Sequence, residues 1–110
     1  IYDVLSAWPV IGRGNGKWEA QKVKLAMAVE GKNRHYQLKS IQRRHFNHMA
    51  YRHGYARGAE LVIGQLLERT ASVIDSVRSK LPADFPTQVA DAILNGLESS
   101  AQALAQMPAE

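Results

Sequence analysis

The first residue that could take part in chemistry is Asp3, a single carboxylate within the mostly apolar segment of residues 1–9. Magnesium prefers hard oxygen donors and is commonly held by one or two carboxylates together with substrate phosphates. The residue type therefore allows a Mg²⁺ ligand at Asp3. One carboxylate is not a complete site, however, and a role in a turn or helix cap explains the same residue.

A second group of side chains is suited to binding phosphate. Arginine and lysine are concentrated in residues 34–52, and guanidinium groups bind phosphate in a bidentate manner. Arg43, Arg44 and Arg52 are predicted to lie on the polar side of one helix, where they would contact the backbone of a nucleic acid. A solvated basic surface is the alternative explanation.

The four histidines also fall in this basic segment, at positions 35, 45, 48 and 53. His45 and His48 could face each other on a helix, but no acidic partner at metal-ligand spacing and no HExxH pattern accompanies them. The chain has no cysteine, which excludes thiolate zinc sites, cysteine nucleophiles and a disulfide framework. No serine, histidine and acid combination indicates a catalytic triad.

Residues 10–17 contain three glycines in five positions and are predicted to form a surface loop. The spacing Gly-x-Gly-x-Gly matches neither the Walker sequence nor the Rossmann fingerprint. We therefore expect no nucleotide-binding loop from these residues alone.

A β-hairpin is predicted in the N-terminal half of the chain. Between Val23 and Val29, apolar residues alternate with polar or small ones, which places the apolar set on one face of a strand. Turn residues follow at 30–33, and the alternation resumes at Tyr36. A continuous helix over residues 18–29 is the alternative.

Three helices are predicted after the hairpin. Ser40 is expected to cap a basic helix that ends at Gly54. From Ala59, apolar residues recur at helical spacing until Pro82 ends the pattern, and a last amphipathic helix follows Pro86. Two long amphipathic helices joined by a short turn should pack antiparallel.

The fold class that results is mainly α, a helical subdomain with one small β-hairpin, in a single domain over residues 1–110. Gly64 and Gly96 fall inside the two long helices, where glycine costs about 1 kcal/mol relative to alanine. We interpret both glycines as positions of close helix packing.

The charge is distributed unevenly along the chain. The net charge is +4, but residues 1–55 carry a balance of +7 and residues 56–110 a balance of −3. The basic half could meet an acidic partner or nucleic acid. No apolar run approaches the roughly 20 residues of a membrane helix, so we expect no membrane partner. The absence of cysteine is compatible with a reducing cytoplasm, where we expect the protein.

Several segments together resemble the C-terminal region of the HipA-family serine/threonine kinase toxins. They are Ile-Tyr-Asp-Val-Leu-Ser-Ala-Trp-Pro at 1–9, Lys-Leu-Ala-Met at 24–27, Arg-His-Phe at 44–46, and the pairs Leu81-Pro82 and Phe85-Pro86. The resemblance extends over essentially the whole chain, and its first segment is the most specific.

The resemblance implies a reaction, the transfer of the ATP γ-phosphoryl group to a protein serine or threonine, with glutamyl-tRNA synthetase as the target of some members. Asp3 then takes the position of the aspartate that binds Mg²⁺. The full-length kinase would need ATP and Mg²⁺. Its nucleotide-binding lobe, phosphate-contacting lysine, catalytic aspartate and metal-binding asparagine would precede Ile1, so this chain alone should be inactive and bind no cofactor.

The resemblance also implies partners: the missing N-terminal kinase region, a HipB-like antitoxin, and operator DNA through the antitoxin complex. The helix with Arg43, Arg44 and Arg52 would lie near that DNA. The apolar start of the sequence likewise predicts a C-terminal fragment of a longer protein. The alternative function is a non-catalytic helical module that binds nucleic acid or a protein through its basic N-terminal half.

Overall fold

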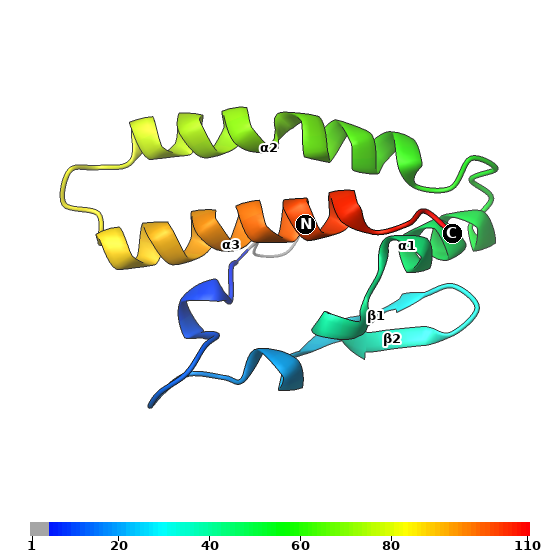
Figure 1. The fold of residues 1–110 in the computed structure, drawn as a ribbon, viewed down its shortest axis with the longest axis horizontal. Coiled ribbons are helices and arrows are strands. Elements are labelled where there is room, and N and C mark those ends of the chain that lie inside the picture. Colours follow the sequence, from blue (N-terminus) through cyan, green and yellow to red (C-terminus); the bar gives the residue numbers. More distant parts are fainter. Residues whose placement is uncertain (1–4) are drawn as a thin grey trace.

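Three α-helices and one β-hairpin form the fold, which a computed structural model describes for residues 5–110 (Figure 1). The predicted fold class, mainly α with one small hairpin, is confirmed. In chain order the elements are η1 (Trp8–Val10), η2 (Ala20–Lys22), β1 (Lys24–Glu30), β2 (Arg34–Gln37), η3 (Leu38–Ser40), α1 (Arg43–Arg52), α2 (Glu60–Lys80) and α3 (Thr87–Gln106).

The hairpin is present, but its predicted apolar face is only partly buried. Strands β1 and β2 pair antiparallel with Glu30 opposite Arg34, and the register is irregular between Lys24 and Val29. Val29, near the turn, is buried, whereas Met27 is 83% exposed. Helix α1 covers only the turn end of the hairpin, since a Cβ on Gly31 would overlap His48. The irregular ladder and this limited cover leave Met27 in solvent.

Helix α1 begins two residues later than predicted. The cap is Gln42, whose side chain accepts from the backbone N–H of His45, while His45 Nδ1 accepts from the backbone N–H of Gln42 at 3.0 Å. The prediction that Ser40 caps this helix is wrong, because Ser40 ends η3 and its hydroxyl donates to the Gln37 carbonyl at 2.9 Å. The predicted end is confirmed, since Gly54 follows with φ of 90°.

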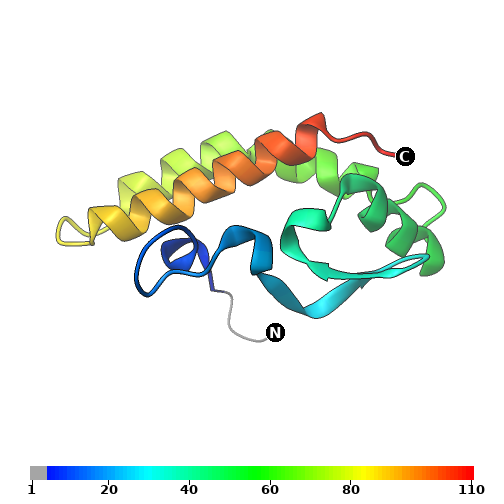
Figure 2. The ribbon, with the colours of Figure 1, turned by 60° about the horizontal axis from the view of Figure 1, so that its bottom comes forward.

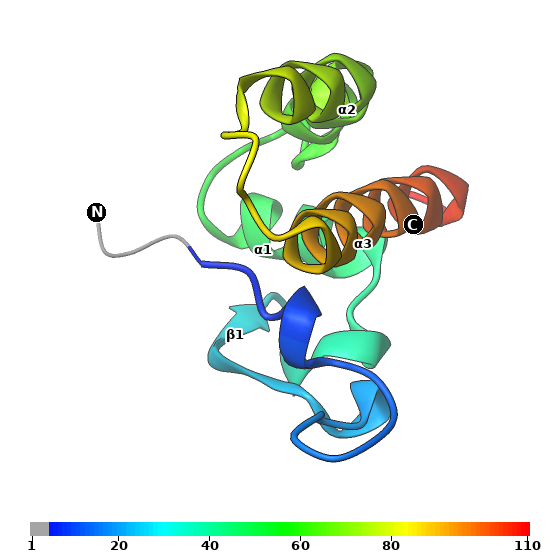
Figure 3. The ribbon, with the colours of Figure 1, turned by 90° about the vertical axis from the view of Figure 1, so that its left-hand side faces the viewer.

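Helices α2 and α3 run antiparallel, as predicted, and are joined by residues 81–86 (Figure 1). Ile63 of α2 and Leu94 of α3 are buried, and Arg78 pairs with Asp91 at 2.9 Å near the connecting turn. Figure 2 shows the N-terminal segment, residues 5–22, and the hairpin together on one side of this helix pair. Viewed end-on in Figure 3, α2 is the outermost layer and α3 lies between it and the N-terminal segment.

The two helix glycines have different surroundings. A Cβ on Gly96 would overlap the indole of Trp8, whereas a Cβ on Gly64 would meet nothing within 4 Å. The close-packing interpretation is therefore wrong for Gly64. It holds for Gly96, but the close neighbour is a side chain of η1 and not another long helix. Trp8 is thus anchored on α3, 88 positions away in the sequence.

Alanine substitutions at these glycines should have opposite effects on stability. Gly96→Ala is expected to lower the free energy of unfolding by about 1–3 kcal/mol, because Trp8 must move. Gly64→Ala is expected to raise it by up to about 1 kcal/mol, because the site is open and alanine is the better helix former. Urea unfolding followed by circular dichroism measures both. Equal effects of the same sign would contradict the contact between Trp8 and Gly96.

Candidate functional site

The predicted metal ligand, Asp3, lies outside the described residues, so its role stays a prediction. The nearest described anchor is η1, which Trp8 attaches to α3 at Gly96. Within residues 5–110, no three or more His, Asp or Glu side chains are grouped so as to hold a metal ion.

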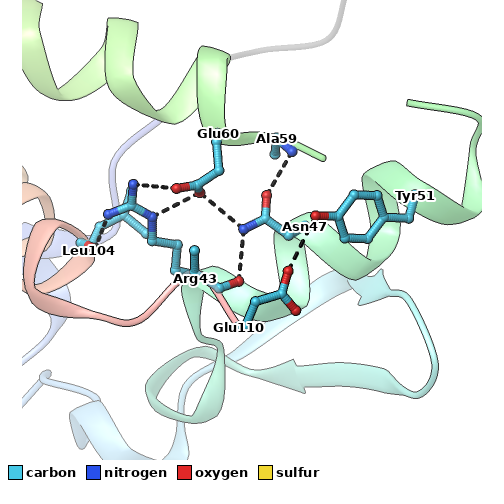
Figure 4. A network of polar contacts seen from close by, with 8 residues as sticks. Arg43, Asn47, Tyr51, Ala59, Glu60, Leu104 and Glu110 are labelled. Carbon is cyan, nitrogen blue, oxygen red and sulfur yellow. Dashed lines mark hydrogen bonds and ion pairs between the residues drawn. The ribbon is translucent and has the colours of Figure 1, made fainter. Parts of the chain in front are cut away.

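Arg43 is bound within the molecule by Glu60 (Figure 4). Its Nη2 and Nε donate to the two carboxylate oxygens at 2.7 and 2.9 Å, and its Nη1 donates to the Leu104 carbonyl at 3.4 Å. The hydrogen bonds from Arg43 and then from Asn47 lower the pKa of Glu60, and the same Glu60 carboxylate raises the pKa of Arg43. With only 17% of its side chain exposed, Arg43 connects α1 to α2 and α3.

Asn47 is the most buried polar side chain described, with no exposed surface. Its Nδ2 donates to Glu60 Oε2 and to the Ala109 carbonyl, both at 3.0 Å, and its Oδ1 accepts from the Ala59 backbone at 2.7 Å (Figure 4). These bonds join α1, the start of α2 and the C-terminal segment. Sequence reasoning missed Asn47, because an asparagine within an amphipathic helix gives no signal of this network.

The other two arginines of the predicted nucleic-acid contact have separate neighbours. Arg52 Nη1 donates to Glu30 Oε1 at 2.8 Å and to the Gly31 carbonyl at 3.2 Å. The hydrogen bond between Arg52 and Glu30 is the largest cause of the lowered pKa of Glu30. Arg44 donates to the side-chain oxygen of Gln42. Arg43, Arg44 and Arg52 therefore share one helix but project in different directions, toward α2, the cap and the hairpin.

Two histidine rings stack between the hairpin and α1. The ring centroids of His35 and His45 are 3.6 Å apart and the rings are nearly parallel, with 7° between their planes. Burial, and then the neighbouring His35 and Arg44, lower the pKa of His45. The capping bond requires an unprotonated His45 Nδ1, because that atom accepts from Gln42. The stack is thus a packing and capping contact that favours neutral imidazole.

Acid should destabilise the protein through His45. The unfolded chain takes up a proton at His45 near pH 6.5, whereas the folded chain does so only at lower pH. Stability contributed by neutral His45 is therefore complete above pH about 6.5 and is lost as the pH falls toward the folded-state pKa. His45→Gln, whose amide oxygen can accept the capping bond, should flatten the stability profile as the pH falls below about 6.5. An unchanged slope in urea unfolding would contradict this.

Helix α2 carries a second apolar stripe that does not face α3. Val62, Leu66, Val73 and Val77 are all exposed, Leu66 by 61%. At about 100° per residue, their spacing places them within about 60° around the helix. The sequence signal was available, because the apolar residues that recur at helical spacing between Val62 and Leu81 cover more of the helix surface than one neighbouring helix can bury.

This stripe continues into an apolar groove of about 710 Å³ between α1 and the first half of α2. Phe46 and Met49 of α1 form one wall, Val62 and Leu66 the other, and Leu104 of α3 also lines the groove. We call the groove and the stripe together the open face, consisting of Phe46, Met49, Val62, Leu66, Val73, Val77 and Leu104.

Comparison with known proteins gives no family assignment. No protein-family model and no curated protein matches this sequence at a significant level. The resemblance to the HipA family therefore stays a prediction, and the packing and charge of the described residues are the basis for a functional proposal.

The surface is large for the size of the chain. Its accessible area is 8672 Å², whereas a compact monomer of 12.2 kDa exposes about 6,100 Å². The radius of gyration is 15.5 Å, against about 13 Å for a compact domain of this length. Among residues 5–110, no helix combines the length and the apolar character needed to cross a bilayer.

Proposed function

We propose that the chain is the C-terminal helical part of the large lobe of a cytoplasmic HipA-like serine/threonine kinase, and that the open face packs against the rest of that kinase. The observation that supports this proposal is the apolar surface on α1 and α2 that nothing in residues 5–110 covers. Monomeric soluble domains rarely expose large contiguous apolar patches, which usually mark an interaction site.

The amount of excess surface supports a permanent contact rather than a transient one. The chain exposes about 2,600 Å² more than a compact monomer of its mass. Obligate interfaces bury about 2,000–5,000 Å² summed over both partners, which is about 1,000–2,500 Å² on each chain, and they are more apolar than transient ones. A module acting alone through its basic half would not need an apolar face of this kind, so the kinase-lobe proposal explains more of the structure.

In the parent kinase, this chain would contribute support and one ligand rather than the phosphoryl-transfer machinery. The parent would transfer the ATP γ-phosphoryl group to a protein serine or threonine, with glutamyl-tRNA synthetase one target in the family. Asp3 would be a Mg²⁺ ligand, five positions before the Trp8 anchor on α3. Phosphoryl transfer depends on positioning ATP, metal and hydroxyl together, so the isolated chain should have no kinase activity.

A HipB-like antitoxin and operator DNA are the proposed partners of the parent protein, with α1 close to the DNA. Because Arg43 and Arg52 are paired with Glu60 and Glu30, Arg44 is the arginine of α1 best able to contact a phosphate. Arg44→Glu should weaken operator binding. It should also reduce the slope of the logarithm of the binding constant against the logarithm of salt concentration by about 1, as for the loss of one phosphate contact. Unchanged affinity in a gel-shift titration, with the fold retained, would exclude Arg44 from the DNA contact.

A comparison of two proteins tests the kinase-lobe proposal. The first is the 110-residue chain, and the second is the same chain with all residues encoded before Ile1. A fragment should bind a hydrophobic dye and self-associate in sedimentation, and both properties should disappear in the longer protein. A monomeric chain that binds no dye but binds DNA in a salt-dependent manner would instead support the non-catalytic module.

A further inference from the structure

The open face has the length of one helix. From Val62 to Val77 the stripe spans 16 residues of α2, a rise of about 23 Å or four helical turns. At the Val62 end of the stripe, Phe46, Met49 and Leu104 lie opposite α2, and together with it they line the groove of about 710 Å³. An amphipathic helix that inserts an apolar stripe is a common occupant of such a groove.

The charged side chains that α2 and the preceding loop place beside this face are basic. Arg69 lies between Leu66 and Val73 along the helix, about 60° from Leu66 around its axis, and it is exposed. Arg57 is exposed in the loop beside Tyr55 and Gly58, two residues that line the groove.

The acidic residues of α2 point elsewhere. Glu68 and Asp75 project about 160–180° away from Leu66 around the helix, and Glu60, the acidic residue at its start, is bonded to Arg43 at 2.7 Å. On α2 and the loop before it, the charged side chains nearest the open face are therefore Arg69 and Arg57, and the floor of that face is apolar. Complementary potential across an interface selects the partner and its register.

We infer that the open face receives a single amphipathic helix with acidic flanks, which packs along α2 and places carboxylates beside Arg69 and Arg57. The inference rests on the proposed function, since this helix would come from the remaining part of the kinase lobe. Its apolar residues would follow the stripe from Val62 to Val77, and its first turns would fill the groove against Phe46 and Met49.

Two labelled synthetic helices of 18 residues test this on the isolated chain by fluorescence anisotropy. Both helices carry four leucines, the last three at 4, 11 and 15 residues after the first, which is the spacing of Val62, Leu66, Val73 and Val77. The residues that flank the leucines are all glutamate in one helix and all lysine in the other. The glutamate helix should bind about tenfold more tightly at low salt. Arg69→Glu should remove or reverse this preference. Lys32→Glu, with the same change of charge in the exposed hairpin turn, should preserve it.

Three results would overturn the inference: equal binding of the two helices, binding that survives Leu66→Asp in a folded protein, or a stable dimer of the chain that neither helix displaces. The last result would make a second copy the occupant. The upstream sequence separates this test from the proposed function. A kinase lobe encoded before Ile1, together with no preference for the acidic helix, overturns the inference alone. An unrelated upstream sequence overturns the kinase proposal.

Discussion

Asn47→Ala is expected to lower the free energy of unfolding by about 3 kcal/mol, the scale for removing a buried polar side chain whose partners are left unsatisfied. The substitution removes three hydrogen bonds, to Glu60, Ala59 and Ala109. The Ala59 amide and the Ala109 carbonyl lose a partner, and a cavity forms beside Gly58. Urea unfolding followed by circular dichroism gives the change directly.

Two matched variants make the Asn47 prediction specific. Asn47→Asp keeps the shape and the acceptor for Ala59, but it places an oxygen where Nδ2 donates to Glu60 at 3.0 Å. Its destabilisation should therefore diminish at acidic pH, as one of the two carboxylates is protonated. Tyr51→Phe removes only an exposed bond to Glu110 and should cost less than about 0.5 kcal/mol. An Asn47→Ala protein as stable as Tyr51→Phe would show that the network does not stabilise the fold.

Asp3→Asn in the proposed parent kinase is expected to reduce the rate of phosphoryl transfer by about 10²–10³-fold, the scale for losing one electrostatic group at a centre of developing charge. The resemblance gives Asp3 the role of a Mg²⁺ ligand, and an amide lacks the negative charge that makes a carboxylate a strong ligand for this ion. Radiolabelled phosphate transfer to a protein substrate, measured over a range of Mg²⁺ concentrations, gives both the rate and the metal dependence.

The control for Asp3 is Asp84→Asn, which removes a carboxylate of an exposed turn far along the chain. It should leave the rate within about twofold, as expected for a surface substitution away from the reaction centre. An Asp3→Asn kinase with normal rate and normal Mg²⁺ dependence would return Asp3 to the turn or cap role that its residue type also allows.

The elements that were predicted correctly depend on local spacing. Period-two alternation indicated the hairpin, and apolar residues at i, i+3 and i+4, bounded by Pro82 and Pro86, indicated the antiparallel helix pair. The Ser40 cap was wrong, because Gln42 and His45 cap each other and Ser40 bonds within η3. Residue preferences alone rank serine first at this position.

The missed features depend on contacts between distant residues. Arg43 meets Glu60 across 17 positions and Asn47 meets Ala109 across 62, and no periodicity encodes either pair. Trp8 on Gly96 belongs to the same class. These contacts give Arg43 a structural role within the chain, whereas residue type and helix position alone suggested a phosphate contact for it.

Thiol labelling of Leu66→Cys tests the central claim, that the open face is covered in a longer protein. The chain has no native cysteine, so one substitution reports one position, provided that any upstream cysteine is replaced. In the isolated chain, at a concentration low enough to keep it monomeric, Leu66→Cys and Asp75→Cys, on opposite sides of α2, should react rapidly. In the protein extended upstream of Ile1, Leu66→Cys should react at least about a hundredfold more slowly, because a covered site opens only at a cost of a few kcal/mol. Asp75→Cys should stay reactive in the same protein. Equal rates for Leu66→Cys in both proteins would contradict the account.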